Sequence, residues 1–320
     1  MSKFETIEMS VCDTRNIPEA ELFASNSWLQ NISQYGNLKL HGLQDRDRNL
    51  VAFWGWEESR KYGIKLLRTP RFSPAIPFWV SAGNYNSSSR NSRIKKVMAA
   101  FAEDLIEAGG IVSMALPVGI LDTQPLTWNG FKVIVRYTYR LFLDKPEIEI
   151  VAGYASKRRN EISRAKRNGI EVCVSNNLEP AYSLICASLD RKTPGFDARR
   201  VYDIMNRFIK IGQYICCIAI DKEGPVAASF CVHDQHVAYY LLGGFNKEAD
   251  SIGAAPLTLH QCILEAKKKG LSIFDFEGSM VPEIEFYFRT FGGSLTPYFV
   301  ANRASLPLEI GLKLLRRSEF

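Results

Sequence analysis

The sequence has few of the residues that build metal centres or disulfide frameworks. It contains 4 histidines and 7 cysteines among 320 residues. The histidines show no ligand spacing, and no C-x-x-C pair occurs. The odd number of cysteines, with Cys216 and Cys217 adjacent, is typical of reduced thiols in a protein core. This pattern favours a cytoplasmic protein without a zinc site or structural disulfides.

Several common functional motifs are also absent. There is no Walker A motif, no Rossmann glycine pattern and no G-x-S-x-G elbow. The N-terminal stretch MSKFETIEMSVCD lacks the apolar segment of a signal peptide, and no window approaches about 18 uninterrupted apolar residues. The last amphipathic stretch, LPLEIGLKLLRR, favours docking on the domain over membrane contact. We therefore expect a cytoplasmic protein with at most peripheral membrane contact.

What is present is the composition of a folded chain. The sequence is 46% apolar and 23% charged, which excludes a disordered protein. Its length suits two domains of about 150 residues each. The net charge of +6 permits attraction to phosphates or an anionic surface without requiring either.

One pattern of elements occurs twice, at an offset of about 160 residues. In each half, predicted strands are followed by an amphipathic helix, a glycine and a buried strand. The first set comprises strands 49–56 and 62–70, helix 92–108 and strand 111–117; the second comprises strands 213–220, 225–232 and 236–245, helix 256–269 and strand 271–276. This order predicts an α/β fold with mixed sheets and helices on their faces. The periodicity is interrupted near Lys145–Ser156, which predicts domains 1–150 and 151–320.

A glycine-rich connection precedes the second repeated helix. The strand ends in Gly243 and Gly244, and after a polar loop Gly253 and Ala255 lead into the helix. No Ser, Thr, Asp or Asn stands directly before this helix, so its first amides lack an obvious cap and form a candidate anion or carbonyl site. The alternative is an ordinary loop in which Asp250 or Ser251 caps an earlier turn.

Two carboxylates stand at the end of the last predicted buried strand. Asp275 and Glu277 flank Phe276 in the stretch LSIFDFEG, and in an extended chain they point the same way. Ligands bind at the carboxyl ends of strands in open α/β sheets, and mutual repulsion raises the basicity of paired acids. They are candidate bases for an amine; alternatively, they cap the following helix or pair with Arg289.

A basic helix is predicted at the start of the second domain. Residues Ser156–Gly169 include six Lys or Arg, among them Arg158 and Arg159 in the first turn, where the helix dipole disfavours cations. This conflict favours a phosphate-bearing partner such as tRNA, a diphosphate lipid or a cofactor tail. The alternative is a solvated surface.

Three stretches together carry a family resemblance. SKRRNEISRAKRNGIEV, GAAPLTLHQCILEAKKKGLSIFDFEGS and FYFRTFGGSLTPYF resemble the second domain of Fem-type peptidyltransferases and their GNAT-like relatives, and LPVGILDTQPLTWNGFKVIVRYTYRLFL resembles the upstream domain. The resemblance covers the chain from about Leu38 onward. It implies two tandem GNAT-like domains, each with a mixed, mostly antiparallel sheet. It also implies transfer of an acyl or aminoacyl group to a primary amine.

Two departures from the family pattern bear on the donor. The acyl-CoA loop pattern Q/R-x-x-G-x-G/A is matched only as Asp250, Gly253 and Ala255, and a carboxylate at the first position would repel pyrophosphate. Fem-type members use aminoacyl-tRNA without that loop. They commonly have an aromatic residue followed by lysine in the next helix, and Phe288-Arg289 is the nearest match here.

The resemblance assigns roles to the candidate residues. Asp275 or Glu277 would orient or deprotonate the amine, and amides near Gly243 and Gly244 would polarise the donor carbonyl. Substrate contacts would come from a further set: Arg289, Tyr240, Arg158 and Arg159. The expected enzyme has no tightly bound cofactor and uses acyl-CoA or aminoacyl-tRNA as co-substrate. Its expected acceptor is a cell-envelope, glycan or small-molecule amine, lipid-linked or nucleotide-linked.

Two alternatives remain open. The first is a catalytically inactive GNAT-like binding protein, favoured by the lack of a histidine base and the incomplete loop motif. Such a protein is expected to have its cleft filled by aromatic side chains such as Tyr239, Tyr240 or Phe288. The second is an RNA-binding protein that uses the Ser156–Gly169 helix.

Overall fold

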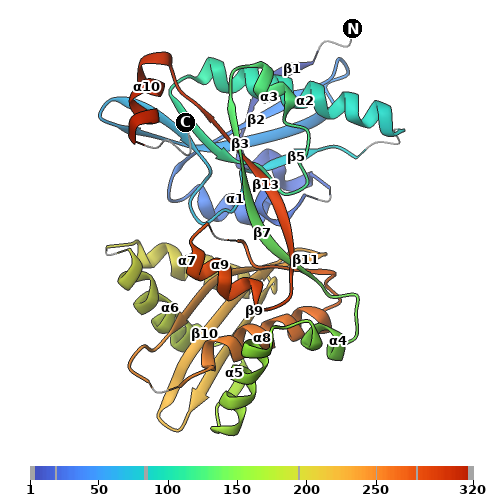
Figure 1. Ribbon diagram of the computed structural model, residues 1–320. Coiled ribbons are helices and arrows are strands. Elements are labelled where there is room, and N and C mark those ends of the chain that lie inside the picture. The colour runs from blue at the N-terminus through green and yellow to red at the C-terminus, as the bar shows by residue number, and fades with distance from the viewer. Residues whose placement is uncertain are drawn as a thin grey trace. The chain divides into compact units, whose positions relative to one another are not determined.

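The computed structural model describes residues 4–18, 20–82, 86–193, 195–249, 251–278 and 280–315. The chain forms two compact units (Figure 1), unit 1 comprising Met1–Arg136 with Pro297–Phe320, and unit 2 comprising Tyr137–Thr296. The chain passes from unit 1 to unit 2 within strand β7 (Lys132–Phe142) and returns within β13 (Ser294–Arg303). The predicted α/β class with mixed sheets is confirmed.

Unit 1 is built on a sheet with strand order β1-β2-β3-β4-β6-β13, and β5 pairs with β3. Its other strands are β1 (Glu5–Met9), β2 (Asn37–Gln44), β3 (Leu50–Lys61), β4 (Ile64–Arg68), β5 (Phe78–Val80) and β6 (Ile111–Ala115). Strands β4 and β6 are parallel, joined by the crossover that contains helix α2 (Ser87–Ala108). The remaining helices are η1 (Val11–Asn16), η2 (Leu22–Ala24), α1 (Asn26–Ile32), α3 (Gln124–Trp128) and α10 (Leu306–Leu315).

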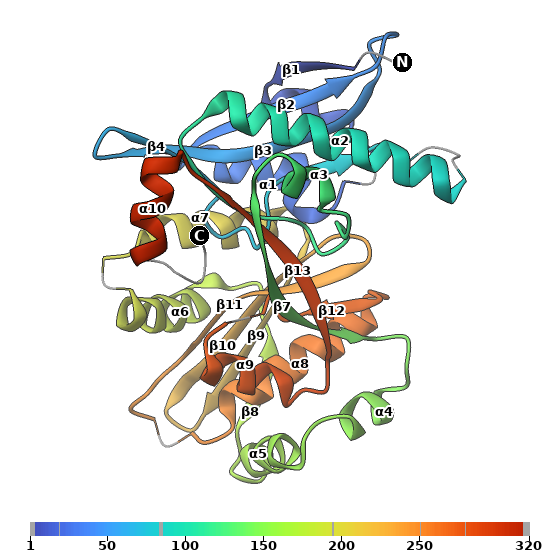
Figure 2. The same cartoon turned by 45° about the horizontal axis from the view of Figure 1, so that its top comes forward.

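Helix α2 supplies much of the core of unit 1. Its buried apolar face carries Val97, Met98, Phe101 and Leu105, which share a core cluster with residues of β2, β3 and β6. Figure 2 shows the helix lying across the sheet of this unit. The helix begins five residues before the predicted start because the Asn86 side chain accepts a hydrogen bond from the Ser89 amide and caps it.

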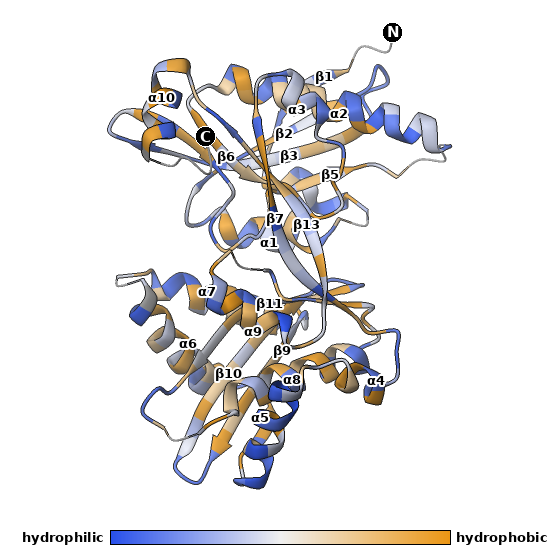
Figure 3. Ribbon diagram, viewed as in Figure 1, coloured by the Kyte–Doolittle hydropathy of each residue, from blue (hydrophilic) through white to orange (hydrophobic). Residues whose placement is uncertain are grey.

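Unit 2 has the strand order β7-β12-β11-β10-β9-β8. Its strands are β8 (Glu171–Val174), β9 (Tyr214–Asp221), β10 (Gly224–His233), β11 (Val237–Phe245) and β12 (Ile273–Asp275), and its helices are α4 (Glu147–Ala152), α5 (Ser156–Arg167), α6 (Leu178–Lys192), α7 (Ala198–Lys210), α8 (Ala254–Lys268) and α9 (Pro282–Arg289). Strands β11 and β12 are parallel, and the pairs among β8 to β11 are antiparallel. Helix α5 is strongly hydrophilic along its length (Figure 3).

The core of unit 2 lies between the sheet and helix α8. Leu259, Cys262, Ile263 and Ala266 of α8 are fully buried and share one cluster with residues of β7, β9, β10 and β12. The spacing of these residues predicted the amphipathic helix. The helix begins two residues earlier than predicted, at Ala254. Three of the seven free cysteines, Cys217, Cys231 and Cys262, belong to this core.

The compact units differ from the predicted division at residue 150. The C-terminal residues belong to unit 1 because β13 pairs with β6 from Val300↔Ala115 to Arg303↔Val112. This pairing joins residues nearly 190 positions apart, so local periodicity does not reveal it. The division into domains 1–150 and 151–320 stays a prediction.

Candidate active site

Strands β11 and β12 separate after a short parallel contact. They pair only from Val237↔Ile273 to Tyr239↔Asp275, where β12 ends and β11 continues to Phe245. Beside this point β11 contains a bulge at Leu241, because Cys231 pairs with Tyr240 and Phe230 pairs with Leu242. Beyond Tyr239 the edge of β11 has no β12 residue opposite it, so its main chain can pair with an extended ligand there.

Asp275, the last residue of β12, is 4% exposed and held by three neighbours. Its Oδ1 accepts hydrogen bonds from the Thr138 hydroxyl at 2.6 Å and the Glu277 amide at 2.9 Å, and Oδ2 lies 3.1 Å from Nε of Arg140. Burial raises the pKa of its carboxyl, while Thr138 and Arg140 oppose that rise. Both carboxyl oxygens of Asp275 are therefore engaged by neighbouring groups.

Glu277 is the less constrained of the two acids. Its Oε1 is buried and has no hydrogen-bond partner among the described residues. Burial, and next the charge of Asp275, raise the pKa of this carboxyl well above its ordinary value. Its backbone has a φ of 60°, a conformation that costs a residue with a Cβ about 1–3 kcal/mol. A strained residue with a buried, unsatisfied acid is the arrangement expected of a functional group.

The turn after Glu277 is fixed by close backbone contact. Gly278 also has positive φ, at 61°, and a Cβ on it would lie 2.2 Å from the Tyr137 carbonyl oxygen. Only glycine fits this approach. The contact with β7 thus holds the strained Glu277 in place.

Tyr240 and the two glycines of β11 form one packed group. A Cβ on Gly243 would lie 1.7 Å from the Tyr240 hydroxyl, and a Cβ on Gly244 would lie 2.3 Å from the Leu184 carbonyl of α6. Gly243 therefore makes room for the phenol, and Gly244 lets α6 approach the sheet. The predicted carbonyl-binding role of these glycines stays a prediction.

A short polar connection runs from β10 to the start of α8. The Ser229 hydroxyl lies 2.8 Å from Thr258 Oγ1, and Thr258 donates to the Ala255 carbonyl at 2.9 Å. Burial raises the pKa of Tyr240 well above its ordinary value, so the phenol stays protonated and can act as a hydrogen-bond donor. Sequence reasoning missed Ser229 and Thr258, because single hydroxyls inside apolar segments give no distinctive signal.

The start of α8 is confirmed as lacking a side-chain cap, with Gly253 at the N-cap at φ 92°. A Cβ on Gly253 would lie 2.3 Å from the Glu161 carbonyl, so this end of the helix packs closely against α5. Ala255 lies in the first turn and accepts the Thr258 bond described above. Asp250, the acid that departs from the CoA pattern, lies outside the described residues.

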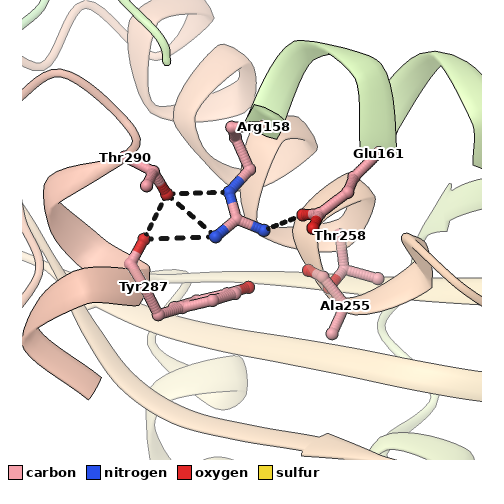
Figure 4. Close-up of polar contacts among 6 residues, drawn as sticks. All are labelled: Arg158, Glu161, Ala255, Thr258, Tyr287 and Thr290. Carbon is pink, nitrogen blue, oxygen red and sulfur yellow. Dashed lines mark hydrogen bonds and ion pairs between the residues drawn. The ribbon is translucent and has the colours of Figure 1, made fainter. Parts of the chain in front are cut away.

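Arg158 occupies an internal position and does not face solvent (Figure 4). It is 4% exposed. Its Nε and Nη2 donate to Thr290 Oγ1 at 3.0 and 2.8 Å, and Nη1 lies 2.6 Å from Glu161 Oε2. The guanidinium also stacks on the rings of Tyr287 and Phe291, at 4.4 and 4.8 Å from their centroids. Arg158 thus ties α5 to α9, and its predicted phosphate contact has no support from this geometry.

The other two predicted arginines lie on the surface or near it. Arg159 is half-buried and donates to the main-chain carbonyls of Ala152 and Tyr154. Arg289 is exposed and lies 3.2 Å from Glu285, one turn earlier in α9. The acids at the end of β12 do not pair with it. Nor do they cap α9, whose N-cap is Val281 without a side-chain bond.

Aromatic side chains meet where β11 and β12 separate. Phe288 of α9 contacts Tyr240 and Phe276, with ring centroids 5.7 and 5.6 Å apart. Tyr239 points elsewhere and its hydroxyl donates to Asp234. The cluster forms the apolar wall of the site on the α9 side. It also matches the filled cleft expected of the non-catalytic alternative.

The arrangement defines the class of fold. Residues 156–288 match the family model described as an acetyltransferase (GNAT) domain. No curated protein matches the sequence. The fold is GNAT-like, as the resemblance implied.

Three solved structures extend the likeness to nearly the whole chain. The protein is similar to FemX, at 12% identity over 97% of this chain and 100% of that chain, with a TM-score of 0.67. It is similar to a tandem GNAT protein from the clavulanic acid biosynthesis pathway, at 10% identity over 93% and 98% of the two chains, with a TM-score of 0.53. It is also similar to L-PGS from Bacillus licheniformis, at 13% identity over 91% of this chain and 92% of that chain, with a TM-score of 0.54. The predicted Fem-like similarity is confirmed at the level of the fold.

Two further properties concern the described residues only. No group of three or more His, Cys, Asp or Glu residues among them is placed to hold a metal ion. None of their helices is both long and apolar enough to cross a membrane.

Proposed function

We propose that the protein transfers an acyl or aminoacyl group to a primary amine, with Glu277 as the group that accepts the amine's proton. The observation that carries this proposal is the buried Oε1 of Glu277, which has no hydrogen-bond partner among the described residues and belongs to a residue in a strained conformation where β11 and β12 separate. The GNAT match over residues 156–288 and the similarity of fold to FemX support acyl transfer as the reaction class.

The chemistry follows from the charges at this point. An amine arrives as an ammonium ion, which favours the ionised form of Glu277. The raised pKa of Glu277 then makes proton transfer from the ammonium less unfavourable than it would be to an ordinary carboxylate. The neutral amine attacks the donor carbonyl, and the C–N bond forms as the bond to the leaving group breaks. The proton that the attacking nitrogen then loses passes to the leaving group, which departs as a free thiol or hydroxyl.

Other residues would orient the reactants. The edge of β11 after Tyr239 would offer main-chain groups to the donor and to the developing oxyanion. The amides near Gly243 and Gly244 would polarise the donor carbonyl. The protonated Tyr240 would donate a hydrogen bond to the leaving group. Asp275 would hold the Glu277 amide and so position the base.

Acyl-CoA and aminoacyl-tRNA are the two donors that we propose, as co-substrates without a tightly bound cofactor. The solvent-facing side of α5, with exposed Lys157, Arg164 and Arg167, is suited to contact phosphates of either donor. The acceptor that we propose is an amine on a cell-envelope precursor, a glycan or a small molecule, reached in the cytoplasm.

One observation favours a second candidate, a GNAT-like binding protein without turnover. Phe288 is in contact with both Tyr240 and Phe276 at the separation of the strands, where these rings would have to move to admit a donor. Such a protein would bind an amine or a nucleotide-linked sugar beside Glu277.

The test measures donor consumption. Acetyl-CoA and alanyl-tRNA are each incubated with the protein and a panel of primary amines, and amide products are detected by mass spectrometry. Glu277→Gln is expected to lower the rate by about 100-fold or more. The control, Glu283→Gln, removes an exposed acid in the first turn of α9 and should leave the rate unchanged. Full activity of Glu277→Gln would refute the proposed base, and amine binding without product from either donor would favour the second candidate.

A further inference from the structure

Unit 1 contains a pocket of about 710 Å³ whose lining residues all lie between Pro18 and Ile120. This size is typical of small-molecule sites. The pocket is formed by β5, the first turns of α2 and the segment after β6. It belongs to the part of the chain outside the GNAT match at residues 156–288.

The apolar wall of the pocket is rigid. Trp79 is half-buried, its ring stacks on the buried Phe53 at 6.1 Å, and its indole N–H donates to the Pro18 carbonyl at 3.0 Å. Phe78 beside it is 6% exposed and contacts Phe101 of the core at 5.8 Å. Because Phe53 and Pro18 fix the Trp79 ring, this ring presents a preformed flat surface, and ligand binding requires no ordering of it.

The polar wall contains two arginines. Among the described residues that line the pocket, Arg90 and Arg93 are positively charged and Glu21 is an acid. Arg93 is held in place by a hydrogen bond to the Ser81 hydroxyl at 2.5 Å, and the charge of Asp45 acts on it as well. Arg90 lies one turn earlier in α2, is exposed, and has no ion pair with any described residue. It is the cation of the pocket that is available to a ligand.

We propose that this pocket binds a small molecule with one anionic group, a carboxylate or a phosphate, and one planar apolar group. The anion pairs with Arg90, supported by the charge of Arg93, and the planar group lies against Trp79. A guanidinium prefers these anions because it donates two parallel hydrogen bonds to them. The proposal does not depend on the function proposed for unit 2, since every described residue that lines the pocket belongs to unit 1.

The test follows the indole N–H signal of Trp79 by NMR. The sequence has 5 tryptophans, and Trp79→Phe identifies the relevant signal by its loss. Phenyl phosphate, phenylacetate, inorganic phosphate and neutral benzyl alcohol are titrated into the full-length protein. The two anionic aromatic probes should shift the signal saturably, with a Kd at least about threefold lower than that of benzyl alcohol or inorganic phosphate, the gain expected of an exposed charge pair.

Matched arginine variants test the assignment of the anion site. Arg90→Gln should remove the advantage of the anionic aromatic probes, and Arg60→Gln, which changes an exposed arginine of β3 outside the pocket, should not. Neither variant loses a structural contact of the side chain, so both should fold. Equal affinity for the anionic and neutral aromatic probes, an unchanged Kd in Arg90→Gln, or the absence of a saturable Trp79 shift with every probe would each overturn the proposal.

Discussion

Replacement of Glu277 by glycine should make the protein more stable and less active. The wild-type residue has a φ of 60° and a buried carboxyl oxygen with no hydrogen-bond partner in the part of the chain that the structure describes. Relief of backbone strain raises the free energy of unfolding by about 1 kcal/mol, and removal of the unsatisfied oxygen raises it by about 1–2 kcal/mol. The greater conformational freedom of glycine in the unfolded chain lowers the free energy of unfolding by about 0.7 kcal/mol. Loss of the buried side-chain methylenes lowers it by about 1 kcal/mol. The net gain is about 1 kcal/mol, a rise in Tm of about 2–4 °C for a unit of this size.

Calorimetry and the amide-product assay together check this prediction. Glu277→Gln is the matched variant, because it keeps the strain and removes the charge. The folded-state pKa of the Glu277 carboxyl is raised above its ordinary value of 4.5. The contribution of this carboxyl to stability is therefore fully present below pH 4.5 and is lost as the pH rises through the folded-state pKa, by about 1.4 kcal/mol per pH unit. In Glu277→Gln, the free energy of unfolding should lack this dependence on pH. A Glu277→Gly variant that is less stable than the wild type, or fully active, would refute the reasoning.

Three further outcomes are expected from the packing of unit 2. Arg158→Leu should lower the free energy of unfolding, measured in urea, by about 2–4 kcal/mol because it breaks a buried ion pair. Arg159→Ala should lower it by less than about 1 kcal/mol. Equal losses in the two variants would contradict the inference that the buried arginine contributes more to stability than the half-buried one. Gly244→Ala should reduce Tm by several degrees, since the new Cβ would lie 2.3 Å from the Leu184 carbonyl; an unchanged Tm would show that α6 can shift freely. Burial lowers the pKa of His260 to about 4. The contribution of this group to stability is therefore fully present above its ordinary pKa of 6.5, and about 3 kcal/mol is lost as the pH falls through 4. In His260→Gln, the free energy of unfolding should change less over this pH range.

Local patterns in the sequence were sufficient for the helices and strands of the repeated pattern, whereas helices such as α6 and α7 were not predicted. The spacing of Val97, Phe101 and Leu105 predicted α2, and that of Leu259 and Ile263 predicted α8, because a helix buries one face regardless of what covers it. The strands of the meander in unit 2 were predicted from short apolar runs between polar turns, since neighbouring strands need only a turn to pair.

The candidate site was predicted only in part. The two acids at the end of β12 and the uncapped start of α8 were found because charge beside an apolar run is a local signal. Their partners were not found, because Thr138 and Asp275 are 137 positions apart in the chain. Arg158 shows the same limit: its position in a basic stretch predicted exposure, but its contacts with Thr290 and Tyr287 come from a distant helix.

The sequence by itself determined the helical and extended segments, the acidic end of the last strand and the resemblance to Fem-type and GNAT-like proteins, because each is written in residues close together in the chain. Only the tertiary structure decided that the C-terminal strand returns to unit 1, that Asp275 is engaged by Arg140, and that Oε1 of Glu277 is buried with no hydrogen-bond partner among the described residues. The physical reason is that burial and desolvation depend on which distant segments pack together, and these set the charge state and the strain of a site.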